Sequence, residues 1–332
     1  MNLFRFLPSL FMGLGLLGCG QSEGPSITTP VQPVVVASAP AAKTEIALVM
    51  KTLTNPFFIE MEKGARRAEK ELGIKLIVKT AAQETSIEQQ IQLVEDLIAD
   101  KVSAIVIAPG DSQRLVPALK KAQDAGIKIV NIDNRLDVDA VKQAGMPPVP
   151  FVSVDNEAGA YKAGKFLTEG IATPTQAAIL EGIRSADNAQ QRTQGAKRAL
   201  TENKNIKLVA SETANWKIDE AYDVTKQMFG KYPNIKLVFA SNDIMAIGVI
   251  KYLQDTRKVD VLVAGYDALD EAIVEIKAKK MVATIDQQAS EQGYQGVALA
   301  LRLTQGSAVP AVTTIDTRLV TAASLSASAF GR

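Results

Sequence analysis

Short apolar runs alternate with longer amphipathic stretches along most of the chain. The first run, residues 46–50, has the length of a buried strand, and the stretch after it places apolar residues at helical spacing from Phe58 to Leu72. Gly73 follows directly, as expected where a helix ends in a left-handed residue. A strand followed by a helix is therefore the unit that the pattern predicts.

This unit recurs through the rest of the chain. Residues 74–78 are a second predicted strand, and Ser86 with Gln89 has the spacing of a capping box that opens the next helix. Residues 102–108 have almost no polar alternation, which is expected when both faces of a sheet are covered. Further apolar runs predict strands at residues 127–132, 151–154, 176–180, 207–210, 236–240, 259–264 and 281–285.

Strands separated by helix-length crossovers predict an α/β fold with parallel sheets. The number of such units exceeds one small sheet, so we expect two doubly wound domains. The pattern places the break between them at residues 145–150, because Met-Pro-Pro-Val-Pro sustains neither helix nor strand. Ligands of such sheets bind outside the carboxyl ends of the strands, so the residues just after each apolar run are the informative ones.

Composition excludes much of enzyme chemistry. The chain has 332 residues, 47% hydrophobic and 22% charged, as in an ordinary globular protein long enough for two domains. Its 37 Lys plus Arg balance 36 Asp plus Glu, so we expect no nucleic-acid partner. With no His and one Cys, Ser-His-Asp triads, Cys-His pairs, His-ligated or Cys-rich metal sites and an intrachain disulfide are excluded. We expect neither a metal nor a cofactor.

The N-terminus accounts for the single Cys. Residues 1–17 carry one positive charge, at Arg5, and an apolar run too short for a comfortable membrane span. Gly18-Cys19 resembles the bacterial lipoprotein box, in which the thiol is acylated and the chain is cut just before it. We therefore expect a signal peptide at residues 1–18, lipidation of Cys19, and a proline-rich tether at residues 19–44. A plain secretory signal with an incidental buried Cys is the alternative.

Polar side chains and a few aromatic rings follow many of the predicted strands. The members of this set are Lys51, Asn55, Phe57, Phe58, Asp133, Asn134, Arg135, Trp216, Asn242, Asp243, Asp267, Asp286 and Gln287. Sugar hydroxyls both donate and accept hydrogen bonds, and the C–H faces of a sugar pack on aromatic rings. Any one of these residues alone could be a loop cap or a solvated charge. Their recurrence at strand ends favours a sugar site.

Several motifs carry a resemblance to a known family. They are residues 46–58 (IALVMKTLTNPFF), 131–133 (NID), 240–246 (ASNDIMA), 263–267 (VAGYD) and 283–287 (ATIDQ). Together they resemble the ribose and allose periplasmic binding proteins, which are type I substrate-binding proteins of ABC importers, over roughly residues 45–320.

The resemblance implies two lobes joined by a hinge of three segments. The N-terminal lobe would comprise residues 45–154 and 288–315, and the C-terminal lobe residues 155–287 and 316–332. The ligand would lie between the lobes. Closure of the cleft would let contacts from both lobes form together, so ligand binding would shift an open-closed equilibrium.

The resemblance also implies roles for individual residues. In the first lobe, Asn55, Phe57, Phe58 and Asp133 match ligand contacts of the family, and Lys51 matches a lysine of the allose-binding branch. In the second lobe, Arg192 matches the ligand arginine, Trp216 matches a ring that covers the sugar face, and Asn242, Asp267 and Gln287 match polar contacts.

Some residues depart from the family pattern and limit what can be said of the sugar. Ribose binders have Arg directly after the first-lobe Asp, whereas here Asn134 intervenes and Arg135 is displaced, which reverses its direction in an extended segment. Asp286 replaces a small apolar residue and could demand an additional hydroxyl or a cationic group if it faced the cleft. Arg184 is an extra arginine after a second-lobe strand, and its role is open.

The resulting hypothesis is a monomeric lipoprotein at the periplasmic or extracytoplasmic face of a membrane. It would bind a monosaccharide, a pentose or hexose, and deliver it to the permease of an ABC importer. A sensor that presents its closed form to a chemoreceptor or sensor kinase, and a binder of another small polar ligand, are alternatives. An enzyme using Asp133 and Asp267 as paired carboxylates is a further one. A LacI-type repressor is excluded, because a signal peptide and tether stand where its basic helix-turn-helix would be.

Overall fold

The computed structural model describes residues 43–330, with side chains up to residue 327. The expected signal peptide, the lipidation site Cys19 and nearly all of the expected tether lie outside the described residues. None of the helices in the described range is long and apolar enough to cross a membrane.

The strands of the described range form two six-stranded sheets. The first has the order β11-β5-β4-β3-β1-β2, and the second has the order β12-β10-β9-β8-β6-β7. Every neighbouring pair is parallel except β10 and β12, which are antiparallel. The strands of the first sheet are β1 (Glu45–Met50), β2 (Lys75–Thr80), β3 (Ala104–Ile107), β4 (Lys128–Ile132), β5 (Phe151–Val154) and β11 (Val312–Ile315). Those of the second are β6 (Thr175–Glu181), β7 (Ile206–Thr213), β8 (Ile235–Ala240), β9 (Leu262–Ala264), β10 (Ala283–Asp286) and β12 (Arg318–Thr321).

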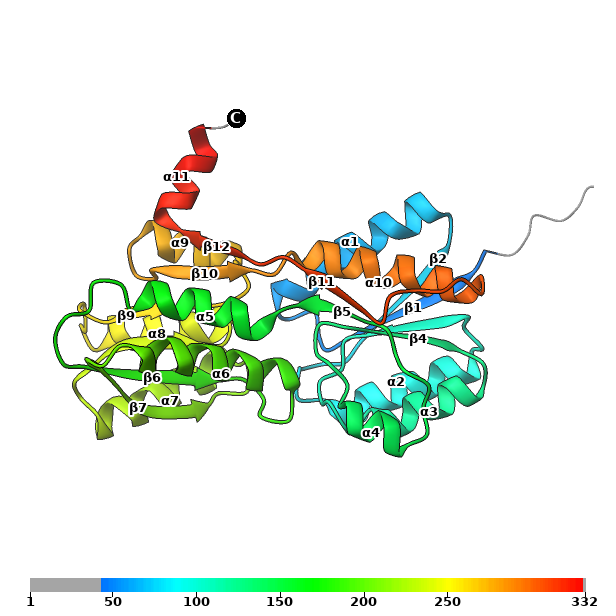
Figure 1. The fold of residues 1–332 in the computed structure, drawn as a ribbon, viewed down its shortest axis with the longest axis horizontal. Coiled ribbons are helices and arrows are strands. Elements are labelled where there is room, and N and C mark those ends of the chain that lie inside the picture. Colours follow the sequence, from blue (N-terminus) through cyan, green and yellow to red (C-terminus); the bar gives the residue numbers. More distant parts are fainter. Residues whose placement is uncertain (1–42, 331–332) are drawn as a thin grey trace, which may run out of the picture. The chain divides into compact units, whose positions relative to one another are not determined.

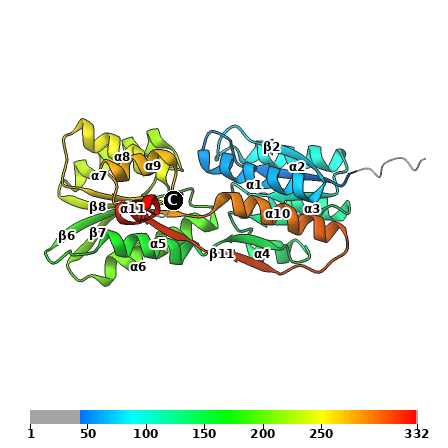
Figure 2. The same cartoon turned by 90° about the horizontal axis from the view of Figure 1, so that it is seen from above.

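Helices cover both faces of each sheet, which confirms the predicted fold class. The first sheet carries α1 (Pro56–Leu72) and α10 (Ala289–Thr304) on one face, and α2 (Ile87–Ala99), α3 (Val116–Asp124) and α4 (Val138–Gln143) on the other (Figure 1). The second carries α5 (Asn156–Leu167) and α6 (Asp187–Glu202) on one face, and α7 (Ile218–Lys231), α8 (Asp243–Asp255) and α9 (Asp270–Lys277) on the other (Figure 2). The chain ends with α11 (Ala322–Phe330) after β12. We call the first sheet with its helices the first lobe, and the second sheet with its helices the second lobe.

Burial on both faces explains why the strands are continuous apolar runs. Along β1, Ile46 and Leu48 pack in a cluster with α1, whereas the intervening Ala47 and Val49 pack in a cluster with α2 and α3. All four side chains are fully buried. Successive strand residues point to opposite faces, so a strand covered on both sides needs apolar residues at every position.

Within the described residues the chain passes between the lobes three times, at short connections. The first follows β5, the second joins β10 to α10, and the third joins β11 to β12. The break that the pattern placed at residues 145–150 is wrong by one strand. Phe151 of β5 still pairs with Asn131 of β4, so the proline-rich segment ends inside the first lobe and the crossing comes after Val154.

Two local predictions also differ from the structure. The strand predicted at residues 259–264 is shorter, because Val259 is 94% exposed and Asp260 forms an ion pair with Lys236. The helix predicted after Ser86 begins at Ile87, but the capping box does not form. Ser86 makes no side-chain cap hydrogen bond, and Gln89 Oε1 accepts instead from the backbone N–H of Ala82 at 2.8 Å.

α1 packs closely on α10, and we expect this packing to depend on Gly64 in the middle of α1. A Cβ on Gly64 would lie 1.7 Å from the backbone oxygen of Ser290, so Gly64→Ala should lower the free energy of unfolding by about 1–3 kcal/mol. The measurement is urea unfolding. Gly230→Ala is the control, because a Cβ added at this position has no atom within 4 Å. Since alanine also favours a helix, this substitution should be neutral or stabilising. Equal stability of the two variants would contradict the assignment.

Candidate functional site

A cleft between the two lobes gathers polar and aromatic side chains from both. The side chains around it leave a free volume of only about 10 Å³. The residues that line it are Lys51, Asn55, Phe57, Phe58, Glu84, Asp133, Asn188, Arg192, Trp216, Asn242, Asp267 and Gln287. The structure thus brings together every side chain to which the resemblance gave a ligand contact, and adds Glu84 and Asn188.

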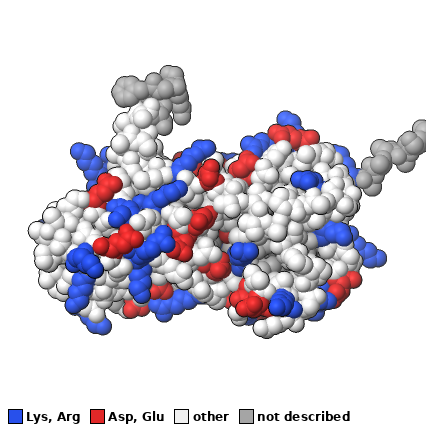
Figure 3. All heavy atoms as spheres, viewed as in Figure 1, with Lys and Arg blue, Asp and Glu red and all other residues white. Residues whose placement is uncertain are grey.

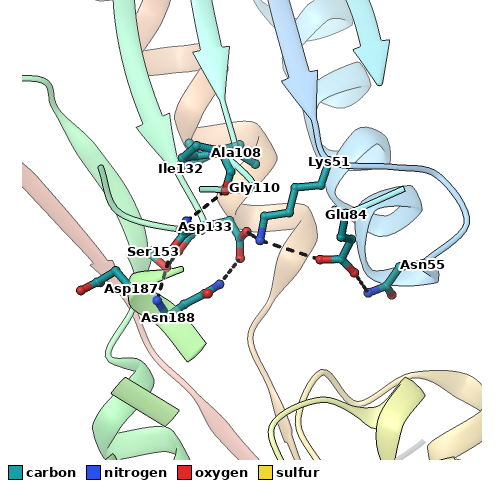
Figure 4. A network of polar contacts seen from close by, with 12 residues as sticks. Lys51, Asn55, Glu84, Ala108, Gly110, Ile132, Asp133, Ser153, Asp187 and Asn188 are labelled. Carbon is teal, nitrogen blue, oxygen red and sulfur yellow. Dashed lines mark hydrogen bonds and ion pairs between the residues drawn. The ribbon is translucent and has the colours of Figure 1, made fainter. Parts of the chain in front are cut away.

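On the first-lobe side, Lys51 lies between two carboxylates (Figure 4). Lys51 follows β1 directly, and its Nζ lies 2.8 Å from Asp133 Oδ2 and 3.9 Å from Glu84 Oε2. Asn55 Nδ2 donates to Glu84 Oε1 at 3.0 Å, while Asn55 Oδ1 caps α1 by accepting from the N–H of Phe57 at 3.1 Å. Burial raises the pKa of Glu84, and the Lys51 ammonium partly opposes that shift.

Asp133 is held in place by its backbone as well as by Lys51. It lies just past the end of β4 with a φ of 61°, in the left-handed region that non-glycine residues rarely adopt. Ser153 Oγ donates to the Asp133 carbonyl at 2.8 Å, and Asn188 Nδ2 of the second lobe donates to Asp133 Oδ1 at 3.4 Å. The carboxylate therefore faces the second lobe.

On the second-lobe side, Arg192 of α6 is immobilised by three hydrogen bonds. Its Nε donates to Asn156 Oδ1 at 2.8 Å, its Nη1 to the Ser241 carbonyl at 3.0 Å, and its Nη2 to Gln287 Oε1 at 3.0 Å. The side chain is only 4% exposed. A planar guanidinium bound at each nitrogen is a rigid donor, which suits recognition of a fixed arrangement of acceptors.

Aromatic rings form walls on both sides of the cleft. The Arg192 guanidinium lies 4.0 Å from the ring centroid of Tyr266 and 5.6 Å from that of Trp216. Trp216 Nε1 is buried and has no hydrogen-bond partner, so the ring can offer both a flat face and a donor. On the opposite side, Phe57 and Phe58 meet edge to face with centroids 5.1 Å apart.

Asp267 and Gln287 complete the second-lobe surface. Gln287 Nε2 donates to Asp267 Oδ1 at 2.5 Å, and Arg192 Nη1 lies 3.6 Å from the same oxygen. Burial raises the pKa of Asp267 well above its usual value, with Arg192 opposing and Asp243 adding to the shift. Asn242 Oδ1 accepts from the N–H of Met245 at 2.9 Å and caps α8, which leaves its Nδ2 as the group that can act in the cleft.

Direct hydrogen bonds between the lobes hold the cleft closed. The N–H of Asn188 donates to Asn134 Oδ1 at 3.1 Å, and the N–H of Asp187 donates to Ser112 Oγ at 3.0 Å. The N–H of Ser112 in turn donates to the Ser185 carbonyl at 3.1 Å. Asn134, the residue inserted after Asp133, is fully buried and serves this contact without lining the cleft.

The three residues whose roles the sequence left open lie outside the cleft lining. Arg135 sits over the ring of Phe151 at 5.2 Å. Arg184 donates from Nε to Glu181 Oε2 at 2.7 Å and is largely exposed. Asp286 does not face the cleft: its Oδ1 accepts from the N–H of Gln288 at 2.7 Å, at the second crossing.

Glu84 and Asn188 line the cleft but were not predicted from the sequence, because the sequence only weakly indicates a role for either. Glu84 lies in the loop between β2 and α2, four residues beyond the end of β2, where the rule for strand ends already applies. Asn188 lies one helical turn before Arg192 on α6, so both side chains project from one face. The motif of the family identified Arg192 as a ligand contact but did not identify Asn188.

The cleft is suited to binding a small polar solute. It holds the cations Lys51 and Arg192 and the carboxylates Glu84, Asp133 and Asp267, which offer charged donors and acceptors from both lobes. Among residues 43–327, no group of three or more His, Cys, Asp or Glu side chains could hold a metal ion. Charges of both signs are mixed over the face seen in Figure 3.

Behind the cleft, Asp243 is a fully buried carboxylate at the start of α8. Its Oδ1 accepts from Thr284 Oγ1 at 2.7 Å, and its Oδ2 accepts from the N–H of Leu269 at 2.9 Å. Burial raises its pKa to about 6, and these hydrogen bonds oppose the shift only in part.

Comparisons with known proteins give a consistent result. Residues 46–308 match the family model of the periplasmic binding protein domain. A D-ribose/D-allose-binding protein of Pseudomonas aeruginosa is 40% identical over 80% of this chain and 83% of its own length. A D-allose-binding periplasmic protein of Escherichia coli is 35% identical over 80% and 86%. The crystal structure of an ABC transporter periplasmic solute binding protein from Actinobacillus succinogenes with bound D-allose is 42% identical, with a TM-score of 0.79 over 84% of this chain and 98% of that one.

The raised pKa of Asp243 predicts how stability changes with pH. The folded state binds a proton to this carboxyl more tightly than the unfolded state, so the free energy of unfolding should rise as the pH falls from 7.5 to 5.5. The contribution of Asp243 is on the order of 1 kcal/mol in this window. Urea unfolding at both pH values measures it.

Asp243→Asn should remove this part of the pH dependence. Asp219→Asn, at an exposed position in the first turn of α7, should keep it. Carboxyls with lowered pKa values, such as Asp137, are ionised in both states throughout the window and do not contribute. An identical pH slope in wild type and Asp243→Asn would show that this carboxyl does not titrate as stated.

Proposed function

Because the chain belongs to the periplasmic binding protein domain family, as a solute-binding protein of the sugar ABC transporter type, we propose that it binds a monosaccharide in the cleft between its lobes. The ligand is a pentose or hexose of the ribose or allose kind. One observation carries the proposal: Lys51 with Asp133 on one lobe faces Arg192 with Asp267 on the other, within aromatic walls.

The chemistry of the cleft matches that of a sugar. Each sugar hydroxyl can donate to a carboxylate such as Asp133 or Asp267 and accept from Lys51 or Arg192. The ring of Trp216 and the pair Phe57–Phe58 offer surfaces for the C–H faces. The closed cleft leaves a free volume of only about 10 Å³, far less than a sugar ring needs, so a sugar would enter when the lobes part.

Closure of the lobes is the proposed mechanism. Residues 45–154 with 288–315, and residues 155–287 with 316–332, are proposed as the two bodies that move about the three crossings. A sugar that touches both bodies binds the closed form better than the open form, and so shifts the population toward closure. Gln287 lies at the second crossing and is hydrogen-bonded to both Arg192 and Asp267. A ligand that changes these hydrogen bonds can therefore affect the hinge.

Delivery and anchoring complete the proposal. The closed form is proposed to hand the sugar to the permease of an ABC importer, as a monomer at the periplasmic or extracytoplasmic face of a membrane. Residues 1–18 are proposed as a signal peptide, Cys19 as the acylated residue and residues 19–44 as the tether. The short apolar run, the Gly18-Cys19 pair and the prolines of that segment support this part.

Sugar titrations test the binding site. Ribose or allose should raise the melting temperature of the protein in a concentration-dependent way, because the sugar binds only the folded state. Arg192→Ala should weaken binding by about 2 to 4 kcal/mol in calorimetry, since buried partners and sugar hydroxyls lose charged hydrogen bonds.

Arg135→Ala is the matched control, because Arg135 sits over Phe151 outside the cleft lining and its loss should leave affinity unchanged. Absence of a melting shift with every pentose, hexose and polyol would overturn the monosaccharide proposal. Wild-type affinity in Arg192→Ala would remove the arginine from the site.

Cys19→Ser tests the anchor. A thiol is needed for acylation, so the variant should leave the membrane fraction and change its electrophoretic mobility. Cell fractionation followed by detection of the protein measures both. A serine variant that still sediments with membranes at the same mobility would show that Cys19 carries no lipid.

A further inference from the structure

The turn that carries Asp267 has a backbone that ordinary residues avoid. Asp267 has a φ of 125° and Ala268 a φ of 55°, and neither is glycine. Residues in the left-handed region cost free energy unless their surroundings hold them there. Something must therefore fix this turn, and with it the direction of the Asp267 carboxylate.

Asp243 is bound on both sides of this turn, while the N–H of Asp267 itself donates to the Ile285 carbonyl at 2.8 Å. Asp243 Oδ2 accepts from the N–H of Leu269 at 2.9 Å, one side of the turn. Its Oδ1 accepts from Thr284 Oγ1 at 2.7 Å, and that hydroxyl oxygen accepts from the N–H of Ala268 at 3.1 Å. Its own N–H donates to the Tyr266 carbonyl at 2.8 Å, which holds the other side. Tyr266 and Leu269 are thus bound directly to Asp243, and Ala268 is linked to it through the Thr284 hydroxyl.

Gly265 leaves room for the Asp243 carboxylate to approach the turn. A Cβ on Gly265 would lie 2.1 Å from Asp243 Oδ1, so only glycine lets the carboxylate approach the turn. Asp243 itself does not line the cleft and is fully buried. Its carboxylate is therefore committed to the turn.

We propose that Asp243 is a positioning residue for Asp267, and that it sets ligand affinity by holding the Asp267–Leu269 turn in its strained conformation. This inference rests on the proposed function in so far as Asp267 is taken as a sugar contact. Asparagine in its place keeps the shape of the side chain but has one acceptor oxygen, so either the N–H of Leu269 or the hydroxyl of Thr284 loses its acceptor.

The burial of a carboxylate here also argues against a role in stability alone. A carboxyl whose pKa is raised to about 6 by burial destabilises the folded state at neutral pH relative to a neutral group. Its charge also acts on Asp267, whose pKa it raises. Protonation would lower that cost, so the free energy of folding alone gives no reason for an ionised carboxyl beside the turn.

A double-mutant cycle tests the proposal. The four proteins are wild type, Asp243→Asn, Asp267→Asn and the double variant, titrated with D-allose by calorimetry at pH 7.5. Asp243→Asn should bind about tenfold more weakly. Adding Asp243→Asn to Asp267→Asn should cause no further loss, because the first residue acts through the second.

Matched controls separate positioning from general damage. Thr284→Ser keeps the hydroxyl and should keep affinity, whereas Thr284→Val removes it and should weaken binding like Asp243→Asn. Asp219→Asn, at an exposed position of α7, should bind as wild type. Additive losses in the cycle, or wild-type affinity in Asp243→Asn, would overturn the proposal.

A second measurement does not depend on sugar. In carbon-13 NMR of the side-chain carboxyls, Asp243→Asn should move the Asp267 resonance and lower its pKa, and Asp219→Asn should do neither. An unchanged Asp267 resonance would overturn the proposal. If Asp267 responds but no sugar binds the wild-type protein, the positioning role stands and the proposed function fails.

Discussion

A charge taken out of water must be paired, and the cleft of this protein is organised by that constraint. Lys51 and Asp133 are each about 3% exposed and lie 2.8 Å apart, while the buried Arg192 is bound at every nitrogen. An unpaired charge at such a depth would cost several kcal/mol or more. The charged groups of the cleft pair with one another when no ligand is bound, and each can exchange its partner for a sugar hydroxyl. The same atoms therefore serve stability and ligand binding.

The parallel sheets supply the positions at which these charges meet. Strand ends of one sheet point toward strand ends of the other, so side chains from β1 and β4 face those that follow β8 and β9. Because the chain crosses between the lobes at three short connections, the lobes can move apart without either sheet being disrupted. Gln287 at one crossing is hydrogen-bonded within the cleft, which links the hinge to the site.

The two lobes also contact each other through groups that no ligand needs to touch. Asn134 and Ser112 of the first lobe accept from backbone N–H groups at the start of α6 in the second. Such bonds favour the closed form before any sugar contributes, and a ligand then adds its own differential affinity. The residue inserted after Asp133, a departure from the ribose-binding pattern, thereby serves closure, and Arg135 is turned onto Phe151.

The sequence by itself determined the alternation of strands and helices, the double-sided burial of the sheets and the side chains gathered at the strand ends. These features are local or periodic, so the spacing of apolar residues and the motifs around Asn55, Asp133 and Asp267 are enough to predict them. Only the tertiary structure decided that β5 stays in the first sheet beyond the prolines, that Val259 is exposed and that Asp286 points away from the cleft. It alone brought Glu84 and Asn188 to the site and placed Asp243 behind Asp267. The reason is that a side chain's direction and partners depend on segments distant in the chain, whose approach no local pattern records.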